Sequence, residues 1–254
     1  ARDTFVAGAQ TKGLAEQGAQ ELFDLILKFA GYGFNKSHST GYSIVAYQTA
    51  FLKTYFPVQY MAAVLTYESV SIEKVVEYID ECRRVMFPDG HRGIQVRPPD
   101  INLSDVGFTV VFEPGEKRDA NHGHVRFGLS AVKGVGDKAI GAIIETRTKG
   151  GPFKNLYDFC ERVPLGSVNR ATIEALIKCG AFDSVHGAQQ RAAMVESLDG
   201  AIQAGQRAAA DRASGQMSFF GGAPEPAAAV AAAPAPAVKL PNTTPWSPAE
   251  QLKH

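Results

Sequence analysis

A glycine–valine–glycine turn decides the fold of this chain, and it lies within Leu129-Ser-Ala-Val-Lys-Gly-Val-Gly-Asp-Lys-Ala-Ile-Gly-Ala-Ile-Ile144. Gly134 and Gly136 permit a tight turn with a bare backbone. Val135 between them is expected to point inward, and Ala139 is small enough to let two helices approach closely. The spacing of the apolar residues and the glycines therefore predicts a helix-hairpin-helix.

This turn has the chemistry of an anion site, because it presents successive backbone N–H groups at the start of the second helix, where the helix dipole favours an anion such as a phosphate. Basic residues outnumber acidic ones between positions 131 and 154: Lys133, Lys138, Arg147, Lys149 and Lys154 stand against Asp137 and Glu145. Such a patch binds phosphates without reading bases. The residues expected to bind DNA are Lys133, Gly134, Val135, Gly136 and Lys138. An ordinary helical hairpin is the alternative, since glycine pairs are common at turns.

A second, degenerate copy of the motif is expected to follow. Helix 172–178 would lead through the turn Cys179-Gly180-Ala181 into helix 189–203. Ile173, Leu176 and Ile177 would supply its core. The two copies together would form a tandem helix-hairpin-helix.

The rest of the chain predicts a mainly α fold with a small antiparallel β-hairpin. Apolar residues repeat every three or four positions in helices near 15–30 and 40–56, in one beginning at Pro57, and in one capped by Ser71. The period changes to two in 106–112 and 125–129, which predicts two paired strands joined by a long loop. The expected division is a helical region 1–95, a DNA-binding region 96–203, and a flexible Ala/Pro/Gly-rich tail 204–254.

Composition excludes several classes of protein. The 26 basic residues balance the 26 acidic ones, so any nucleic-acid binding must come from a local patch. The sequence has no apolar run of membrane-spanning length, so a membrane partner is not expected. Three scattered cysteines exclude a disulfide framework and a cysteine-rich zinc site, and they suit the cytoplasm. The absence of an initiator Met, and an end that reads as a helix cut in its first turn, lead us to expect a piece of a longer polypeptide.

A polar loop precedes the second predicted helix, with Ser39 or Thr40 as its expected cap. It holds Asn35, Lys36, Ser37 and His38, which on chemistry alone suit a simple capping loop. The run Gly-Phe-Asn-Lys-Ser-His-Ser, with the later Tyr-Gln-Thr-Ala-Phe-Leu-Lys-Thr-Tyr-Phe-Pro, resembles the fingers region of the alpha (polymerase) subunit of bacterial DNA polymerase III. The resemblance continues through 73–76, 98–102, the helix-hairpin-helix and 177–183, up to about residue 222.

The resemblance implies a DNA-directed DNA polymerase, a nucleotidyltransferase, as the parent protein. Asn35, Lys36, Ser37 and His38 would then contact the incoming dNTP, with Lys36 near the triphosphate and His38 near the sugar. The family binds two Mg²⁺ ions through aspartates of a palm domain, and no paired-aspartate signature occurs here. We therefore expect no metal site and no catalytic residue in this chain, and no polymerisation by it alone.

A short apolar island interrupts the tail: Gln216, Met217, Ser218, Phe219 and Phe220. Exposed aromatic residues in such a tail usually anchor a partner. The pattern resembles the peptide by which bacterial polymerases dock on the sliding clamp (beta subunit). Met217 and Phe220 would fill the clamp pocket, and Gln216 would hydrogen-bond its rim. The alternative is that the island packs on its own domain.

These features predict a part of a bacterial replicative DNA polymerase. Its expected partners are duplex primer–template DNA, the incoming dNTP, the sliding clamp and other replicase subunits. The chief alternative is a free-standing helix-hairpin-helix DNA-binding module of a repair protein, which needs neither the 35–38 loop nor the apolar island. A scaffold without DNA contact is a weaker option. Arg83, Arg84 and Arg92 are left open between duplex contact and solvation of a helix end, and His91, His122 and His124 favour a surface cluster over a metal site.

Overall fold

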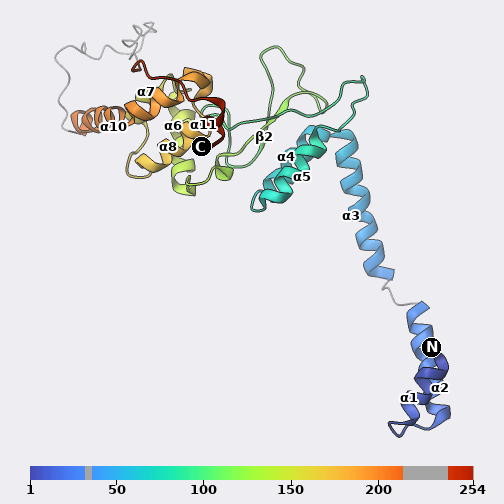
Figure 1. Cartoon of the computed structure of the whole chain (residues 1–254). Helices are drawn as coiled ribbons and strands as arrows, with labels where there is room; N and C mark the ends of the chain where they lie inside the picture. The colour runs from blue at the N-terminus through green and yellow to red at the C-terminus, as the bar shows by residue number, and fades with distance from the viewer. Residues whose placement is uncertain (32–35, 214–239, 254) are drawn as a thin grey trace. The chain divides into compact units, whose positions relative to one another are not determined.

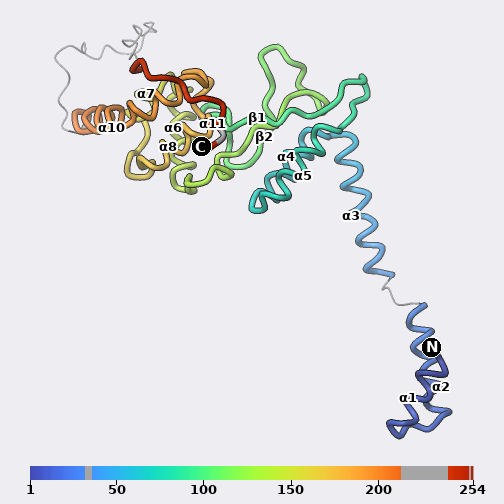
Figure 2. The backbone as a smooth tube through the Cα atoms, in the orientation of Figure 1, coloured from blue at the N-terminus to red at the C-terminus, as the bar shows by residue number. Residues whose placement is uncertain are grey.

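The computed structural model describes residues 1–31, 36–213 and 240–253. It divides into two compact units, Ala1–Thr54 and Tyr55–His254, and each is described by itself. Figure 1 labels the helices and strands, and Figure 2 follows the backbone through them. The two units divide after Thr54, not after residue 95 as predicted. The helices on either side of residue 70 pack against the sheet that follows them, so they belong to the second unit.

The described residues of the first unit form three helices with little core. Helix α1 (Arg2–Gln10) packs on α2 (Glu16–Gly31), with the Phe5 and Phe23 rings 5.4 Å apart and an ion pair between Arg2 and Asp24. Helix α3 (Lys36–Tyr55) buries none of its residues. Large apolar side chains therefore remain exposed on α2 and α3, among them Leu25, Phe29, Tyr42 and Tyr47.

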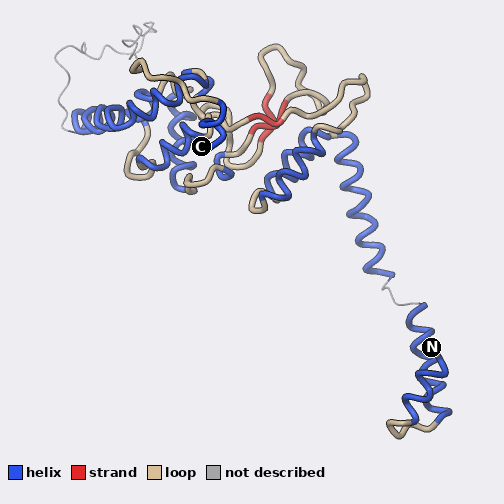
Figure 3. Tube along the Cα trace, in the orientation of Figure 1, coloured by secondary structure: helices blue, strands red, loops and turns tan. Residues whose placement is uncertain are grey.

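The second unit begins with two helices on a small sheet. Helix α4 (Pro57–Tyr67) has proline at its first position, and α5 (Ile72–Cys82) is capped by the Ser71 hydroxyl, which accepts from Lys74 N–H at 3.4 Å. Met61, Leu65 and Val125 are fully buried in the core that these elements share. The mainly α fold with its small sheet is confirmed (Figure 3).

The sheet has three strands, one more than predicted. Strands β2 (Thr109–Val111) and β3 (His124–Arg126) pair antiparallel with Val110 opposite Val125, as the alternating pattern indicates. The additional strand, β1 (Val96–Arg97), pairs parallel with β3. A two-residue strand is too short to show a period of two in sequence, and this explains why it was missed.

Helices form a second core in the later part of this unit. The elements are η1 (Leu129–Ala131), α6 (Asp137–Gly150), α7 (Leu156–Arg162), α8 (Arg170–Lys178), α9 (Asp183–His186), η2 (Ala188–Gln190) and α10 (Arg191–Ala213). Asn155 and Asn169 cap α7 and α8 through their side chains. Leu129, Ile143, Phe159, Leu176 and Leu198 are fully buried between these helices. No described helix combines the length and apolar character that a membrane span requires.

A short polar motif connects the sheet to the helical core through hydrogen bonds. Asp100 holds the turn by accepting from Asn102 N–H at 2.8 Å. The Asn102 side chain donates to the Phe153 carbonyl at 2.9 Å and accepts from the Phe153 N–H at 2.7 Å. The N–H of Ile101 donates to the carbonyl of Ala181 at 2.8 Å. The Pro-Pro-Asp-Ile-Asn run at 98–102 is therefore a structural joint.

The predicted tail 204–254 needs correction where the structure describes it. Helix α10 continues to Ala213, because helical pairing does not stop at the change of composition. Leu240 packs against the helical core, and the Thr243 hydroxyl donates to Glu196 on α10. The segment ends in α11 (Pro248–Lys253). Residues 240–253 thus belong to the second unit, and Leu240 and Thr243 contact its helical part.

Candidate nucleic-acid interface

The glycine turn lies between η1 and α6, as the sequence predicts. Gly134 has φ +89°, a conformation that L side chains rarely adopt, so this position requires glycine. Gly136 is the N-cap of α6 with an ordinary φ of −90°, and a Cβ built there would meet nothing within 4 Å. Gly134 is therefore needed for the shape of the turn, while Gly136 leaves its surface bare.

The turn keeps most of its N–H groups exposed. Val135 N–H donates to the Val132 carbonyl at 3.2 Å, and this bond closes the turn. Within the described residues, no protein acceptor lies on four other amides of the turn and of the first turn of α6: Gly134, Gly136, Asp137 and Lys138. All four belong to exposed residues. The amides are thus available to an anion from outside the protein.

A rigid support holds the turn in place. Val135 is only 8% exposed and points into the helical core, and Ala139 is buried beside it. The Thr172 hydroxyl, at the start of α8, donates to the Gly134 carbonyl at 3.3 Å. A Cβ on Gly134 would lie 3.8 Å from the Ala175 methyl group. The turn is therefore seated on α8 through its carbonyl side, with its amide side outward.

The positive charge around the turn is smaller than the sequence count indicates. Lys133 and Lys138 are exposed beside the free amides. Arg147, by contrast, is half-buried and donates to the main-chain carbonyls of Ile101, at 2.9 Å, and of Ser104. Lys149 pairs with Glu145 one helical turn away. Lys133 and Lys138 are accordingly the two lysines placed to meet phosphates at the turn.

The second glycine turn does not repeat this geometry, which corrects the prediction of a tandem motif. The N–H of Gly180 donates to Ile177 at 3.1 Å, and the N–H of Ala181 donates to Leu176 at 2.9 Å. These bonds end α8 in a glycine C-cap with φ +88° at Gly180. The guanidinium of Arg191 and the carboxylate of Asp183 close over the glycine. Helices α9 and η2 also separate α8 from α10. This turn is buried and its amides are used.

The predicted nucleotide contacts lie at the start of α3, apart from Asn35, which is outside the described residues. Lys36, Ser37 and His38 occupy the first turn of the helix and are exposed. The His38 ring meets the Tyr42 ring edge-on at 4.5 Å between centroids. Because the helix starts at Lys36, Thr40 does not cap it: its hydroxyl donates to the Lys36 carbonyl at 2.9 Å. Ser39 likewise lies inside the helix, so the predicted cap is wrong.

Two predictions remain, one on the clamp peptide and one on the absence of a metal site. The proposed clamp peptide, Gln216, Met217, Ser218, Phe219 and Phe220, lies outside the described residues. Asp24 pairs with Arg2, and Asp80 pairs with Arg83. Among the residues that the structure describes, no three His, Cys, Asp or Glu side chains gather to hold a metal ion.

The three histidines near the sheet are held by neighbouring side chains. His91 contacts Asp89 at 2.5 Å and His122 contacts Asp119 at 2.6 Å. His124 is buried, and burial together with the guanidinium groups of Arg97 and Arg126 lowers its pKa to about 4. The ring nitrogen Nε2 of His124 accordingly accepts from Arg126 at 3.1 Å. His124 is a neutral part of the sheet core at physiological pH.

Comparison with known proteins identifies a motif and relatives of this chain. A family model described as a helix-hairpin-helix motif matches residues 93–193, the stretch that contains the turn and α8. DNA polymerase III subunit alpha of Pseudomonas aeruginosa is 42% identical over 234 residues, covering 87% of this chain and 19% of that protein. The chain is a homologue of one segment of DNA polymerase III subunit alpha. The resemblance read from the residues is thereby confirmed.

Other alpha subunits give the same result. That of Escherichia coli K12 is 42% identical over 220 residues, and that of Thermus aquaticus is 41% identical over 225 residues. The chain spans 17% of the length of each of these two relatives. The similarity to the alpha subunits covers far more of the chain than the helix-hairpin-helix match, and so disfavours a free-standing repair module.

Sequence reasoning missed the residues that support the turn. Thr172 and Ala175 lie against the Gly134 side of the hairpin, yet they are about forty residues away in the chain. A threonine on the apolar side of a predicted helix was the available signal, because a buried hydroxyl requires a partner.

Proposed function

We propose that this chain is the part of a bacterial replicative DNA polymerase that holds duplex primer–template DNA through the turn at 134–136. The parent protein would carry out template-directed DNA synthesis from dNTPs. One observation carries the proposal: four exposed amides without a protein acceptor stand beside Lys133 and Lys138, on a turn buttressed by α8. The similarity to DNA polymerase III alpha subunits supports the same assignment.

The chemistry of this site suits a polymerase that must bind any sequence. Main-chain amides and lysines contact phosphate oxygens, which are the same in every base pair. The first turn of α6 adds the positive end of its dipole. Asp137 opens the same helix, and its carboxylate is expected to weaken the site modestly. Binding is therefore predicted to be independent of sequence and strongly dependent on salt.

Replacing Gly136 by Ala tests the proposal with little risk to the fold. The methyl group would project from the exposed turn into open space, where a phosphate is expected to approach the amides. We expect Gly136→Ala to weaken binding of a fluorescent duplex at least several-fold in an anisotropy titration. Gly141→Ala is the matched control: it adds the same methyl group one turn later on α6, also in open space. Equal binding by both variants and the wild type would contradict the proposal.

Two finer roles follow from the resemblance. In the first, Asn35, Lys36, Ser37 and His38 contact the incoming dNTP, with His38 near the sugar. A side chain against the 2′ position would reject ribonucleotides by steric exclusion. We expect His38→Ala in the full-length enzyme to raise ribonucleotide incorporation. Unchanged discrimination between the two sugars would remove His38 from this role.

In the second role, residues 216–220 dock on the sliding clamp. The two apolar anchors, Met217 and Phe220, would each contribute roughly 1.5–3 kcal/mol before the cost of ordering the peptide. A lone peptide should therefore bind at about micromolar affinity, and tethering to DNA would raise its effective concentration. Gln216→Ala combined with Phe220→Ala should abolish clamp binding; intact binding would remove the assignment.

The catalytic part of the reaction is proposed to lie elsewhere in the parent protein. Mg²⁺ would be held by palm aspartates, and the described residues offer no matching ligand group, so no step is assigned to a metal here. The chain alone is therefore expected not to polymerise. Within the cytoplasm, its partners would be duplex DNA, the dNTP, the clamp and other replicase subunits.

A further inference from the structure

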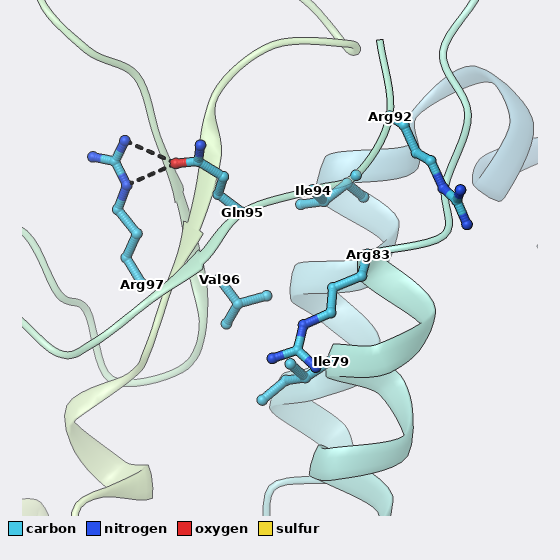
Figure 4. A pocket seen from close by; sticks show the side chains of 8 residues that line it. Ile79, Arg83, Arg92, Ile94, Gln95, Val96 and Arg97 are labelled. Carbon is cyan, nitrogen blue, oxygen red and sulfur yellow. Dashed lines mark hydrogen bonds between the residues drawn. The ribbon is translucent and has the colours of Figure 1, made fainter.

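A groove of about 430 Å³ lies between the end of α5 and residues 92–97, separate from the turn at 134–136. Figure 4 shows its side chains: Ile79 and Arg83 come from the α5 side, and the segment 92–97 provides the opposite wall. Three of the lining residues are arginines, Arg83, Arg92 and Arg97, and none is acidic. Ile79, Ile94 and Val96 give the groove an apolar surface between these charges.

The three arginines differ in how they are held. The Arg97 guanidinium donates to Gln95 Oε1 at 3.2 and 3.0 Å and also pairs with Glu113. Arg83 pairs with Asp80 at 2.6 Å. Arg92 is exposed, and within the described part of the chain it makes no hydrogen bond or ion pair. Its charge is therefore uncompensated.

The open edge of the sheet adds the main-chain N–H and C=O of Val96 to this wall. Val125 N–H donates to the Gln95 carbonyl at 2.9 Å, and Phe127 N–H donates to the Arg97 carbonyl at 3.0 Å. Residues 95 and 97 thus face β3, so the peptide groups of Val96 point to the free edge. A polymer that alternates charged and apolar groups would find polar and apolar partners along this wall.

We propose that this groove binds a single strand of nucleic acid. The guanidinium groups do not converge on one point (Figure 4): Arg83 and Arg92 point in different directions, and Arg97 is turned toward Gln95 and Glu113. Separated cations of this kind suit successive phosphates more than one free anion. The apolar side chains between them can pack against a sugar or a base, and the planar guanidinium groups can stack on bases. A duplex keeps its bases inside and offers only its backbone, so it would leave the apolar wall unused.

This role is additional to the duplex contact proposed for the turn at 134–136. The two sites use different residues, so variants at one should leave the other unchanged. The sequence leaves two roles for Arg83 and Arg92, duplex contact or solvation of a helix end. The groove gives them a different ligand.

The test is an anisotropy titration of a labelled single-stranded oligonucleotide against the full chain. Arg92→Gln and Arg83→Gln are each expected to weaken binding several-fold. The slope of log K against log salt should become shallower by about 0.7 for each arginine removed. Arg84→Gln is the matched control, because Arg84 is an exposed neighbour that does not line the groove, and it should have little effect. Arg92→Lys keeps the charge and should retain most of the affinity.

Three results would overturn the proposal. Equal losses from Arg84→Gln and Arg92→Gln would show general charge attraction. An equal loss of duplex and single-strand affinity would show that the groove does not distinguish them. Inorganic pyrophosphate that binds the wild type and not Arg92→Gln, with strand binding unchanged, would identify a site for a free anion. Lys133→Gln serves as the converse variant: it should weaken duplex binding and spare the single strand, and a loss of single-strand binding equal to that of Arg92→Gln would place the strand outside the groove.

Discussion

The turn at Gly134–Gly136 and the turn at Cys179–Ala181 lie next to each other along α8, and they use their amides in opposite ways. The first exposes four amides and packs only Val135 inward. The second donates the amides of Gly180 and Ala181 to the end of α8 and lies under Arg191. Both glycines at the bend have nearly the same positive φ, +89° and +88°. A glycine at positive φ therefore marks a turn, while its surroundings decide whether the turn can bind a ligand.

The difference has a simple physical cause. Gly180 follows the last turn of a helix, where free carbonyls need donors, so the amides after it are consumed locally. Gly134 and Gly136 precede a helix, where the first amides lack carbonyl partners. The same residue type thus satisfies a helix end in one place and leaves an anion site in the other.

The largest effect that distinguishes the turns should come from Gly180→Ala. The new methyl group would adopt an unfavourable φ and overlap the Arg191 guanidinium, breaking its pair with Asp183. We expect a loss of about 2–4 kcal/mol in the free energy of unfolding, measured by urea denaturation. The folded fraction should bind duplex DNA as the wild type does. A change below about 0.5 kcal/mol would mean that this turn is not packed as described.

Gly134→Ala should have a smaller effect on stability. Backbone strain at φ +89° is the main cost, because the nearest atom to the new Cβ would be Ala175 at an ordinary 3.8 Å. We expect a loss of about 1–2 kcal/mol by the same measurement. If Gly134→Ala proved as costly as Gly180→Ala, the proposed contrast between an open and a covered turn would be wrong.

Salt dependence sharpens the comparison for the open turn. Lys133→Gln combined with Lys138→Gln removes the two exposed lysines beside the amides, and the slope of log K against log salt for a duplex should fall by roughly 1.8. Lys149→Gln is the control, because Lys149 is paired with Glu145 on the same helix. A slope that changes equally in both variants would indicate a diffuse charge effect instead of a site.

The smallest expected effect is the contribution of His186, which follows the covered turn in the chain, to the pH dependence of stability. His186, in α9, accepts the N–H of Leu156 on Nε2 at 2.9 Å, and burial lowers its pKa below the ordinary 6.5. The unfolded chain therefore binds a proton more readily, so stability should fall as the pH drops below about 6.5. His186→Gln should reduce this fall, which is followed by thermal unfolding between pH 7 and 5. His124 contributes in the same direction from the sheet, so the difference between wild type and variant isolates His186.

The sequence predicts local features well and their surroundings poorly. The hairpin at 134–136, the cap at Ser71 and the pairing of 109–111 with 124–126 follow from short-range patterns. The use of the Gly180 amides depends on where α8 ends. The loss of Arg147 from the basic patch depends on carbonyls more than forty residues away. Spacing along one segment carries no information on such distant partners.

The exposed helix α3 also shows that the sequence does not identify distant partners. Its sequence predicts a helix, and the helix forms, but Lys36–Tyr55 buries none of its residues. An apolar pattern predicts that a face will be buried without naming the segment that covers it. Among the described residues of its own unit, no segment covers the apolar side chains of this helix.

The central claim is that the amides of the open turn contact nucleic-acid phosphates. An NMR titration of the ¹⁵N-labelled chain with a short duplex tests it most directly, since each amide is observed separately. The account predicts shifts at Gly134, Gly136 and Lys138, with Gly180 and Ala181 unchanged. Unmoved resonances at the first three amides in a chain that still binds the duplex would contradict it.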